Sequence, residues 1–137
     1  MAVDNTLYVS DYFNGRVMKF TEGFLNGSIV AGTGMTGSST FQLNGPTGLP
    51  VDASFNIYVA DSNNYRVMLW PKNASVGIKV AGTGSSGSTL SSFGTLSGLF
   101  VDLSGNIYVC DVTNHRIMKG HRRIRVEICH PLRRRPQ

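Results

Sequence analysis

A repeat of 50 residues constrains this chain more than any other feature of its sequence. Three segments align without a gap: LYVSDYFNGRVM (7–18), IYVADSNNYRVM (57–68) and IYVCDVTNHRIM (107–118). Six of the twelve columns are identical in all three copies, which chance does not produce. Self-similarity at a period of about 20–50 residues indicates a chain built from stacked supersecondary units. The fold is therefore expected to be a repeat architecture.

The pattern of each copy predicts short strands separated by turn residues. In the second copy, four strands are expected at about 48–52, 56–61, 66–70 and 78–81. These segments are apolar on both faces, which predicts sheets packed between other sheets. One sheet per repeat, stacked face to face, is a propeller blade. The sequence predicts an all-β chain: a partial β-propeller that forms an open arc of about three four-stranded antiparallel blades.

The residue types at the hairpin turns support this prediction in the third copy. In the second copy, one turn residue does not fit it. Gly105 stands where a tight hairpin needs a positive φ, which glycine adopts without a steric cost. The second copy has Phe55 at the same position. Phe55 is therefore the exception to the repeat at this turn.

The repeat also divides the chain into a propeller fragment (1–119) and a basic tail (120–137). The blades are expected at about 1–40, 41–91 and 92–119. In the tail, Ile124, Val126 and Ile128 alternate with charged residues, so one strand can form where the third blade needs its fourth.

An arc of under three full repeats leaves two sheet faces uncovered, because a closed propeller needs about 4–8 blades. Tyr8, Val17, Tyr108 and Ile117 are expected to be unburied on these faces. Soluble monomers tolerate only small exposed apolar patches. Self-association, or contact with the remaining blades of a longer chain, is therefore expected.

The positive charge belongs to the tail. The chain has 13 Lys and Arg against 8 Asp and Glu, and seven of the bases but only one of the acids lie in 119–137. The body is nearly neutral, so a basic face on the propeller is not expected. Tail residues that could make nonspecific anion contacts, including weak contacts to nucleic acid, are Arg122, Arg123, Arg125, Arg133, Arg134 and Arg135.

The repeat resembles the NHL family. A Gly-Leu-x-Val-Asp strand is followed by a turn, by Asn-Ile-Tyr-Val-x-Asp and by Asn-His-Arg-Ile, and Asn106 to Met118 match this pattern best. At the position of His115, the other copies have Tyr65 and Gly15. The resemblance implies a β-propeller of four-stranded blades. Relatives of this kind serve as protein-interaction or RNA-binding modules and as extracellular sensor domains, and a few are lyases or hydrolases.

The repeat signature itself is the main candidate for a site. The Asp that ends one strand and the Arg that begins the next should face each other across a hairpin, while the Asn supplies a side-chain bond to the backbone or a left-handed residue. Presence in every copy favours a structural role over ligand contact. The signature residues are Asp11, Asn14, Arg16, Asp61, Asn64, Arg66, Asp111, Asn114, His115 and Arg116.

Other motifs do not support catalysis or a cofactor. Both Gly32 to Gly37 and Gly82 to Gly87 match GxGxxG, but the residues that follow are poor helix formers, so a dinucleotide site is not expected. The histidines and cysteines lack paired zinc spacing, and no Ser-His-Asp order or GxSxG elbow is present. Met18, Met68 and Met118 are expected to pack between blades.

These observations predict a non-enzymatic binding module that contacts a protein or glycan partner through the loops at one end of the blades. The alternatives are an RNA-binding propeller and the remnant of an enzyme resembling the amidating lyases. No cofactor and no transmembrane segment are expected. The sequons at Asn26 and Asn73 favour an extracellular setting, and no signal peptide is seen.

Overall fold

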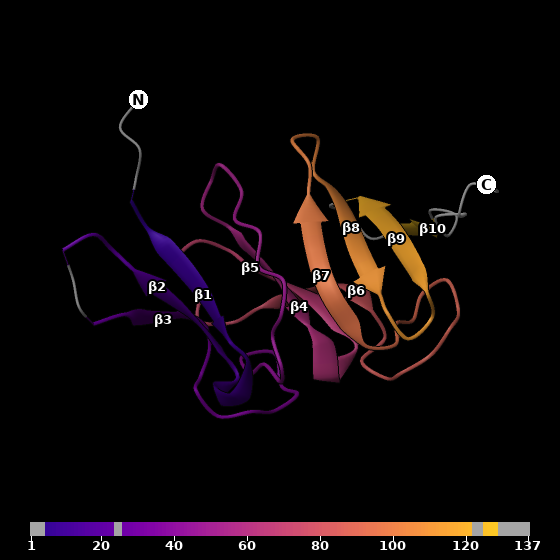
Figure 1. Ribbon diagram of the computed structural model, residues 1–137, viewed down its shortest axis with the longest axis horizontal. Helices are drawn as coiled ribbons and strands as arrows, with labels where there is room; N and C mark the ends of the chain where they lie inside the picture. Colours follow the sequence, from indigo (N-terminus) through magenta and orange to yellow (C-terminus); the bar gives the residue numbers. More distant parts are fainter. Residues whose placement is uncertain (1–4, 24–25, 122–124, 129–137) are drawn as a thin grey trace, which may run out of the picture.

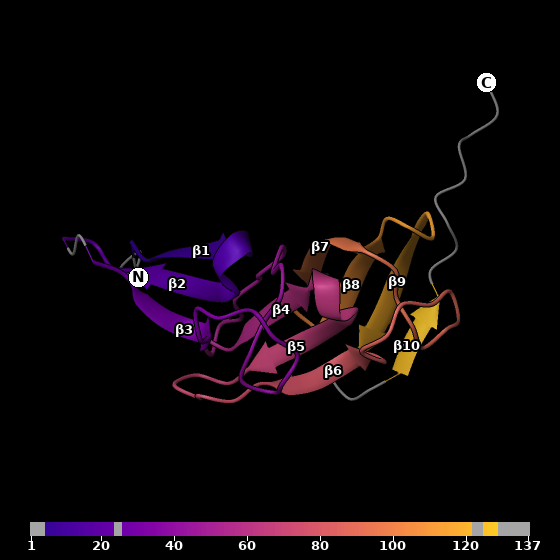
Figure 2. The same cartoon turned by 90° about the horizontal axis from the view of Figure 1, so that it is seen from below.

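The computed structural model describes residues 5–23, 26–121 and 125–128. Within these residues the chain forms ten β-strands, two single turns of 3-10 helix and no α-helix. The prediction of an all-β chain with strands in all three copies is confirmed. Figures 1 and 2 show three sheets that follow one another in chain order, as blades do in a partial propeller.

Each sheet comes from one copy of the repeat, and all neighbouring strands are antiparallel. The first sheet contains β1 (Leu7–Asp11), β2 (Arg16–Phe20) and β3 (Ser28–Gly32). The second contains β4 (Ile57–Asp61), β5 (Arg66–Trp70) and β6 (Ile78–Gly82). The third, in the order β10-β9-β8-β7, contains β7 (Leu96–Val101), β8 (Asn106–Asp111), β9 (Arg116–His121) and β10 (Arg125–Ile128). The 3-10 turns are η1 (Tyr12–Asn14) and η2 (Ser62–Asn64).

The strand register repeats together with the sequence. It places the Asp that ends one strand opposite the Arg that begins the next, in the pairs Asp11–Arg16, Asp61–Arg66 and Asp111–Arg116. The pairing of β2 with β3 shifts between Val17 and Met18, and that of β5 with β6 shifts between Val67 and Met68. The irregularity of the ladder therefore recurs in the first two copies, whereas the pairing of β9 with β10 in the third copy is regular.

The expectation of four strands in every blade is correct only for the third sheet. The segment before β4 lies along it, and the Ala60 N–H donates to the Gly48 carbonyl (2.9 Å), but this segment forms only isolated bridges to the second sheet. Pro46 and Pro50 interrupt it, because a proline has no N–H to donate to the ladder. The third copy has no proline at the equivalent positions and forms the continuous strand β7.

The fourth strand of the third sheet is β10, which pairs with β9 from Arg125 opposite His121 to Ile128 opposite Met118. Its residues belong to the basic tail, whose sequence does not resemble the other copies. Strand pairing requires backbone hydrogen bonds rather than particular side chains. The tail can therefore add the strand β10 beside β9, although its sequence differs from the repeat.

Two hydrophobic clusters form the core, and each lies between two blades. The first interface, between the first and second blades, buries Val17, Ala31, Leu43, Ile57, Val59, Met68 and Trp70. The second interface, between the second and third blades, buries Tyr58, Ala60, Val67, Val80, Phe93, Leu96, Ile107, Val109 and Met118. Most members of the first interface have their counterpart 50 residues later in the second. Met68 and Met118 are fully buried, which confirms inter-blade packing for these two methionines.

The expectation that Tyr8 and Val17 are unburied on an uncovered face of the first blade is wrong. Val17 is fully buried in the first interface, and Tyr8 packs against it. The reason is the alternation of side chains along a strand: both residues point toward the second blade. Leu7 and Val9 point the other way and are exposed. The uncovered face of the first blade is therefore the opposite one to that predicted.

Candidate functional site

The second hairpin cluster, which consists of Asp61, Asn64 and Arg66, is buried and fully hydrogen bonded. Arg66 Nε donates to Asp61 Oδ2 (2.7 Å), and Asn64 Nδ2 donates to the same oxygen (2.8 Å). The Asn44 N–H donates to Asp61 Oδ1 (2.7 Å). The carboxylate is thus satisfied on both oxygens, which offsets the cost of burying its charge.

Arg66 also reaches the loop that joins the first blade to the second. Its two terminal nitrogens donate to the backbone carbonyls of Ser38 (3.0 Å), Ser39 (2.8 Å) and Gln42 (3.0 Å). Asn64 donates to the Gly37 carbonyl (2.8 Å). The hairpin cluster therefore fixes the inter-blade loop as well as its own turn.

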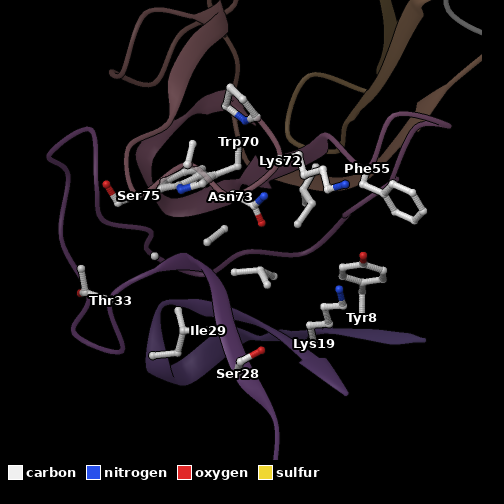
Figure 3. Close-up of a pocket in the computed structure, with 16 residues that line it drawn as sticks. Tyr8, Lys19, Ser28, Ile29, Thr33, Phe55, Trp70, Lys72, Asn73 and Ser75 are labelled. Atoms are coloured by element: carbon white, nitrogen blue, oxygen red, sulfur yellow. The ribbon is translucent and has the colours of Figure 1, made fainter. Parts of the chain in front are cut away.

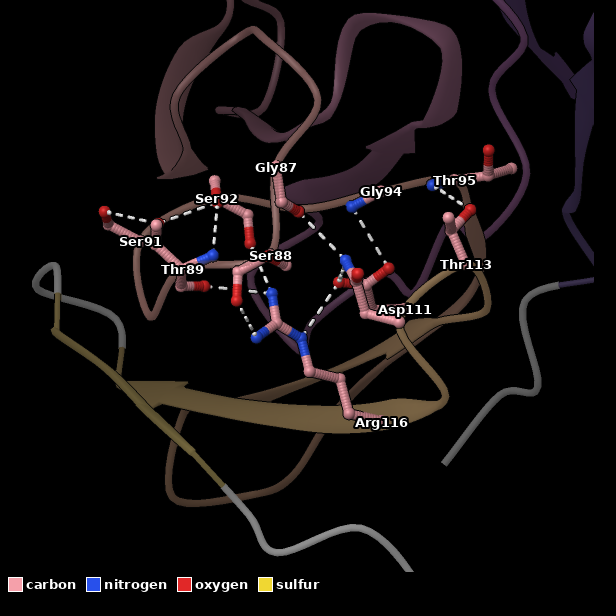
Figure 4. Close-up of polar contacts among 11 residues, drawn as sticks. Gly87, Ser88, Thr89, Ser91, Ser92, Gly94, Thr95, Asp111, Thr113 and Arg116 are labelled. Atoms are coloured by element: carbon pink, nitrogen blue, oxygen red, sulfur yellow. Dashed lines mark hydrogen bonds and ion pairs between the residues drawn. The ribbon is translucent and has the colours of Figure 1, made fainter.

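The third hairpin cluster, Asp111, Asn114 and Arg116, repeats this arrangement 50 residues later (Figure 4). Arg116 donates to Asp111 Oδ2 (3.0 Å) and to the carbonyls of Ser88, Thr89 and Ser92 (2.9, 2.9 and 2.7 Å). Asn114 donates to the Gly87 carbonyl (2.9 Å). The last glycine of the second GxGxxG segment thus accepts a bond from Asn114, and the residues after that segment present carbonyl oxygens to Arg116.

The first hairpin cluster has the same residue types, Asp11, Asn14 and Arg16. Arg16 Nε donates to Asp11 Oδ2 (2.8 Å), and Asn14 donates to both oxygens of Asp11 (3.0 Å each). Among the described residues, no loop carbonyl accepts a bond from Arg16. Hydrogen bonds from Arg16 and Asn14 lower the pKa of Asp11, whereas burial raises the pKa of Asp61.

The left-handed residue of each hairpin is not the Asn. It is the residue after it, at Gly15 (φ 53°), Tyr65 (φ 53°) and His115 (φ 50°). Of the two roles considered for the Asn, the bond from its side chain to the backbone is the one observed in the second and third clusters. His115 itself is exposed.

A pocket of about 700 Å³ opens between the first and second blades (Figure 3). Tyr8 and Lys19 of the first blade lie on one side, and Phe55 and Lys72 of the second blade lie across from them. Trp70, which is buried in the first interface, lines the interior. This volume is within the range of sites that bind small molecules.

The pocket is positively charged at its mouth. Lys72 Nζ lies 5.3 Å from the centre of the Phe55 ring, so the cation and the aromatic face form one surface. Lys19 is the second base, and none of the described residues that line the pocket is acidic. Exposed Asn73 and Ser75 add polar groups at the rim. This lining suits an anionic ligand with an apolar body.

Sequence reasoning did not find this pocket, although a signal was present. Its residues include positions at which the copies differ: Phe55 stands for Gly105, and Trp70 stands for Gly120. Phe55 keeps the glycine conformation with φ 64°, which costs a bulky side chain roughly 1–2 kcal/mol. Departures from an internal repeat, rather than the repeat signature, mark the pocket.

Of the tail arginines, only Arg125 is among the described residues. Arg122, Arg123, Arg133, Arg134 and Arg135 lie outside the described residues, and Arg125 begins β10. Within the described part of the chain, no three His, Cys, Asp or Glu side chains are grouped as metal ligands would be. The same part contains no helix with the length and hydropathy of a membrane span.

No family model matches the chain, and no curated protein matches it. Three solved structures from Bacteroides thetaiotaomicron share the arrangement of its strands. One is a structural genomics protein of unknown function (19% identity, TM-score 0.71, 83% of this chain and 32% of that one). The second is described as a putative phosphatase (18%, 0.66, 89% and 32%), and the third as an auxiliary nutrient binding protein (16%, 0.69, 84% and 34%).

At these identities the likeness concerns the fold alone. The chain spans about a third of the length of each of the three structures. It therefore corresponds to part of each of those proteins.

Proposed function

We propose that this chain is an NHL-like propeller segment that acts as a non-enzymatic binding module, and that the pocket of the first interface binds an acidic glycan. The description of one structural neighbour as an auxiliary nutrient binding protein supports the binding role. The resemblance of the repeat to the NHL pattern supports the architecture. The class of ligand follows from the pocket itself.

The observation that carries the proposal is the surface formed by Phe55 and Lys72. A strained aromatic residue occupies a glycine position at the pocket mouth, and strained residues concentrate where a ligand requires them. A pyranose ring packs its C–H face on an aromatic side chain, and a sugar carboxylate pairs with a lysine ammonium. A uronic acid satisfies both groups at once.

The test uses Trp70, which is the only tryptophan of the chain and lines the pocket. Trigalacturonic acid is titrated into the protein while tryptophan fluorescence is recorded. We expect a saturable change, and we expect Lys72→Gln to raise the Kd about tenfold or more, since a hydrogen bond to a charged group contributes about 1.5–3 kcal/mol. The matched control is Lys79→Gln, because Lys79 is exposed and does not line the pocket.

The methyl ester of the same trisaccharide separates the two parts of the proposal, because it keeps the rings and removes the charge. Binding of the acid but not of the ester supports an acidic glycan as the ligand. Equal binding of both would contradict the role of the lysines. The absence of any saturable change with either sugar would contradict the pocket as a glycan site.

A further inference from the structure

Each blade has two different faces, which are defined here by the blade that they contact. The forward face packs on the next blade in the chain, and the back face packs on the previous one. In the first interface, the forward face contributes Tyr8 and Val17, and the back face contributes Ile57, Val59 and Met68. The alternation of side chains along the strands produces the two faces.

The second interface joins the same two faces with the same residue types. Its forward face contributes Tyr58 and Val67, and its back face contributes Ile107, Val109 and Met118. These are the residues of the first interface shifted by 50 positions. One mode of packing has therefore been used twice within the chain.

The first blade presents a back face that no other described residue covers. Leu7 and Val9 occupy the positions of Ile57 and Val59. Leu7 is 61% exposed and Val9 is 38% exposed, whereas their counterparts Ile57 and Val59 are 4% and 0% exposed. On the paired strand β2, Met18 lies opposite Val9 and is only half-buried.

The third blade presents the complementary forward face. Tyr108 and Ile117 occupy the positions of Tyr58 and Val67, and both are only half-buried. Phe100 lies opposite Tyr108 in the register, is 61% exposed, and has its ring centre 6.0 Å from that of the tyrosine. Lys119 Nζ lies 5.8 Å from the Tyr108 ring centre, at the position that Lys19 holds in the first blade.

We infer that these two faces bind each other between copies, so that the third blade of one copy packs on the first blade of a second copy. The new contact would continue the two existing interfaces, with Tyr108 and Ile117 in the roles of Tyr8 and Val17. Such a contact joins unlike surfaces, and it closes into a ring when the rotation allows. Two copies of about three blades give about six, which is within the range of about 4–8 in closed propellers.

The experiment measures the mass of the 137-residue chain by analytical ultracentrifugation over a range of concentrations. Leu7→Asp damages the back face, and Phe100→Asp damages the forward face. Both side chains are 61% exposed, so neither substitution removes core packing. The matched control is Leu103→Asp, because Leu103 is fully exposed in the turn between β7 and β8, outside the paired strands. Circular dichroism verifies that all variants fold.

We expect the unaltered chain and the Leu103→Asp variant to have twice the mass of one chain, and each face variant to dissociate at least tenfold more readily. An equimolar mixture of the two face variants should associate again, because one copy retains an intact forward face and the other an intact back face. No recovery in the mixture would overturn the head-to-tail contact. A monomer at every concentration would assign the faces to further blades of a longer chain, and mass that grows without limit would exclude a closed pair.

Discussion

Arg16 and Arg66 hold the same position in consecutive copies of the repeat, yet they stabilise the structure in different ways. The Arg66 side chain is 9% exposed and binds one carboxylate and three loop carbonyls. The Arg16 side chain is 33% exposed and binds only Asp11 among the described residues. The difference is the inter-blade loop, which lies over the second hairpin cluster.

This difference shows that the signature Arg serves the contact between blades as much as its own hairpin. In the second and third clusters it connects the hairpin to the preceding loop, and that loop inserts Leu43 or Phe93 into an interface. In the first cluster, where none of the described residues forms such a loop, the Arg16 and Asp11 side chains are 33% and 26% exposed, and an ion pair open to solvent contributes little to stability. Three pairs of substitutions test how far equivalent residues of the copies differ.

The largest effect is expected from the two arginines themselves. Arg66→Met leaves Asp61 buried without its cation and leaves three loop carbonyls without a donor, so the free energy of unfolding should fall by about 3–5 kcal/mol. Arg16→Met should leave it almost unchanged. Urea denaturation of both variants measures the two values. Equal losses would show that the loop contacts do not distinguish the clusters.

Smaller effects are expected at the turns where the copies differ, and the two substitutions tested there should change the free energy of unfolding in opposite directions. Phe55→Gly relieves the left-handed conformation of Phe55, and after the greater chain entropy of glycine is subtracted, the free energy of unfolding should rise by about 0.5–1 kcal/mol. Gly105→Ala should lower it by about 1 kcal/mol, because Gly105 has φ 84°.

Thermal unfolding of both turn variants and titration of Phe55→Gly with trigalacturonic acid complete this test. We expect the more stable variant to bind the sugar less tightly, because it has lost the aromatic surface of the pocket. A Phe55→Gly variant that is less stable and binds normally would refute the interpretation of Phe55 as a strained ligand contact.

The smallest effect is expected from pH. For Asp11 the folded-state pKa lies below its ordinary value of 3.8, so its stabilising contribution is present above that value and is lost as pH falls through the folded pKa. For Asp61 the folded-state pKa is raised, so the folded state holds its proton more strongly, and stability declines as pH rises above 3.8.

The two aspartates should therefore give opposite slopes near pH 4. The measurement is the free energy of unfolding between pH 3 and pH 6 for the unaltered chain, for Asp11→Asn and for Asp61→Asn. Relative to the Asn variants, the Asp11 contribution should increase with pH and the Asp61 contribution should decrease. Slopes of the same sign would mean that burial does not separate the two carboxyl groups.

The sequence by itself determined the repeat, the positions of the two hairpin strands in each copy and the pairing of Asp with Arg across each hairpin. These features depend on local periodicity and on residues five positions apart, as in Asp61 and Arg66, and such relations are visible in a single sequence. Inter-blade packing of Met68 and Met118 also followed, because the same strand position in each copy implies a common environment. The expectation was wrong for Met18, which is only half-buried because its face of the first blade has no neighbouring blade among the described residues.

Only the tertiary structure decided which face of each blade is covered, which carbonyls the arginines bind, and where a pocket forms. The Arg66 partners Ser38 and Ser39 lie 27 or more residues earlier in the chain, and no periodicity identifies a backbone carbonyl as an acceptor. The orientation of Val17 toward the second blade depends on how the blades stack. The pocket combines Lys19 of one blade with Lys72 of the next, and only packing brings those residues together.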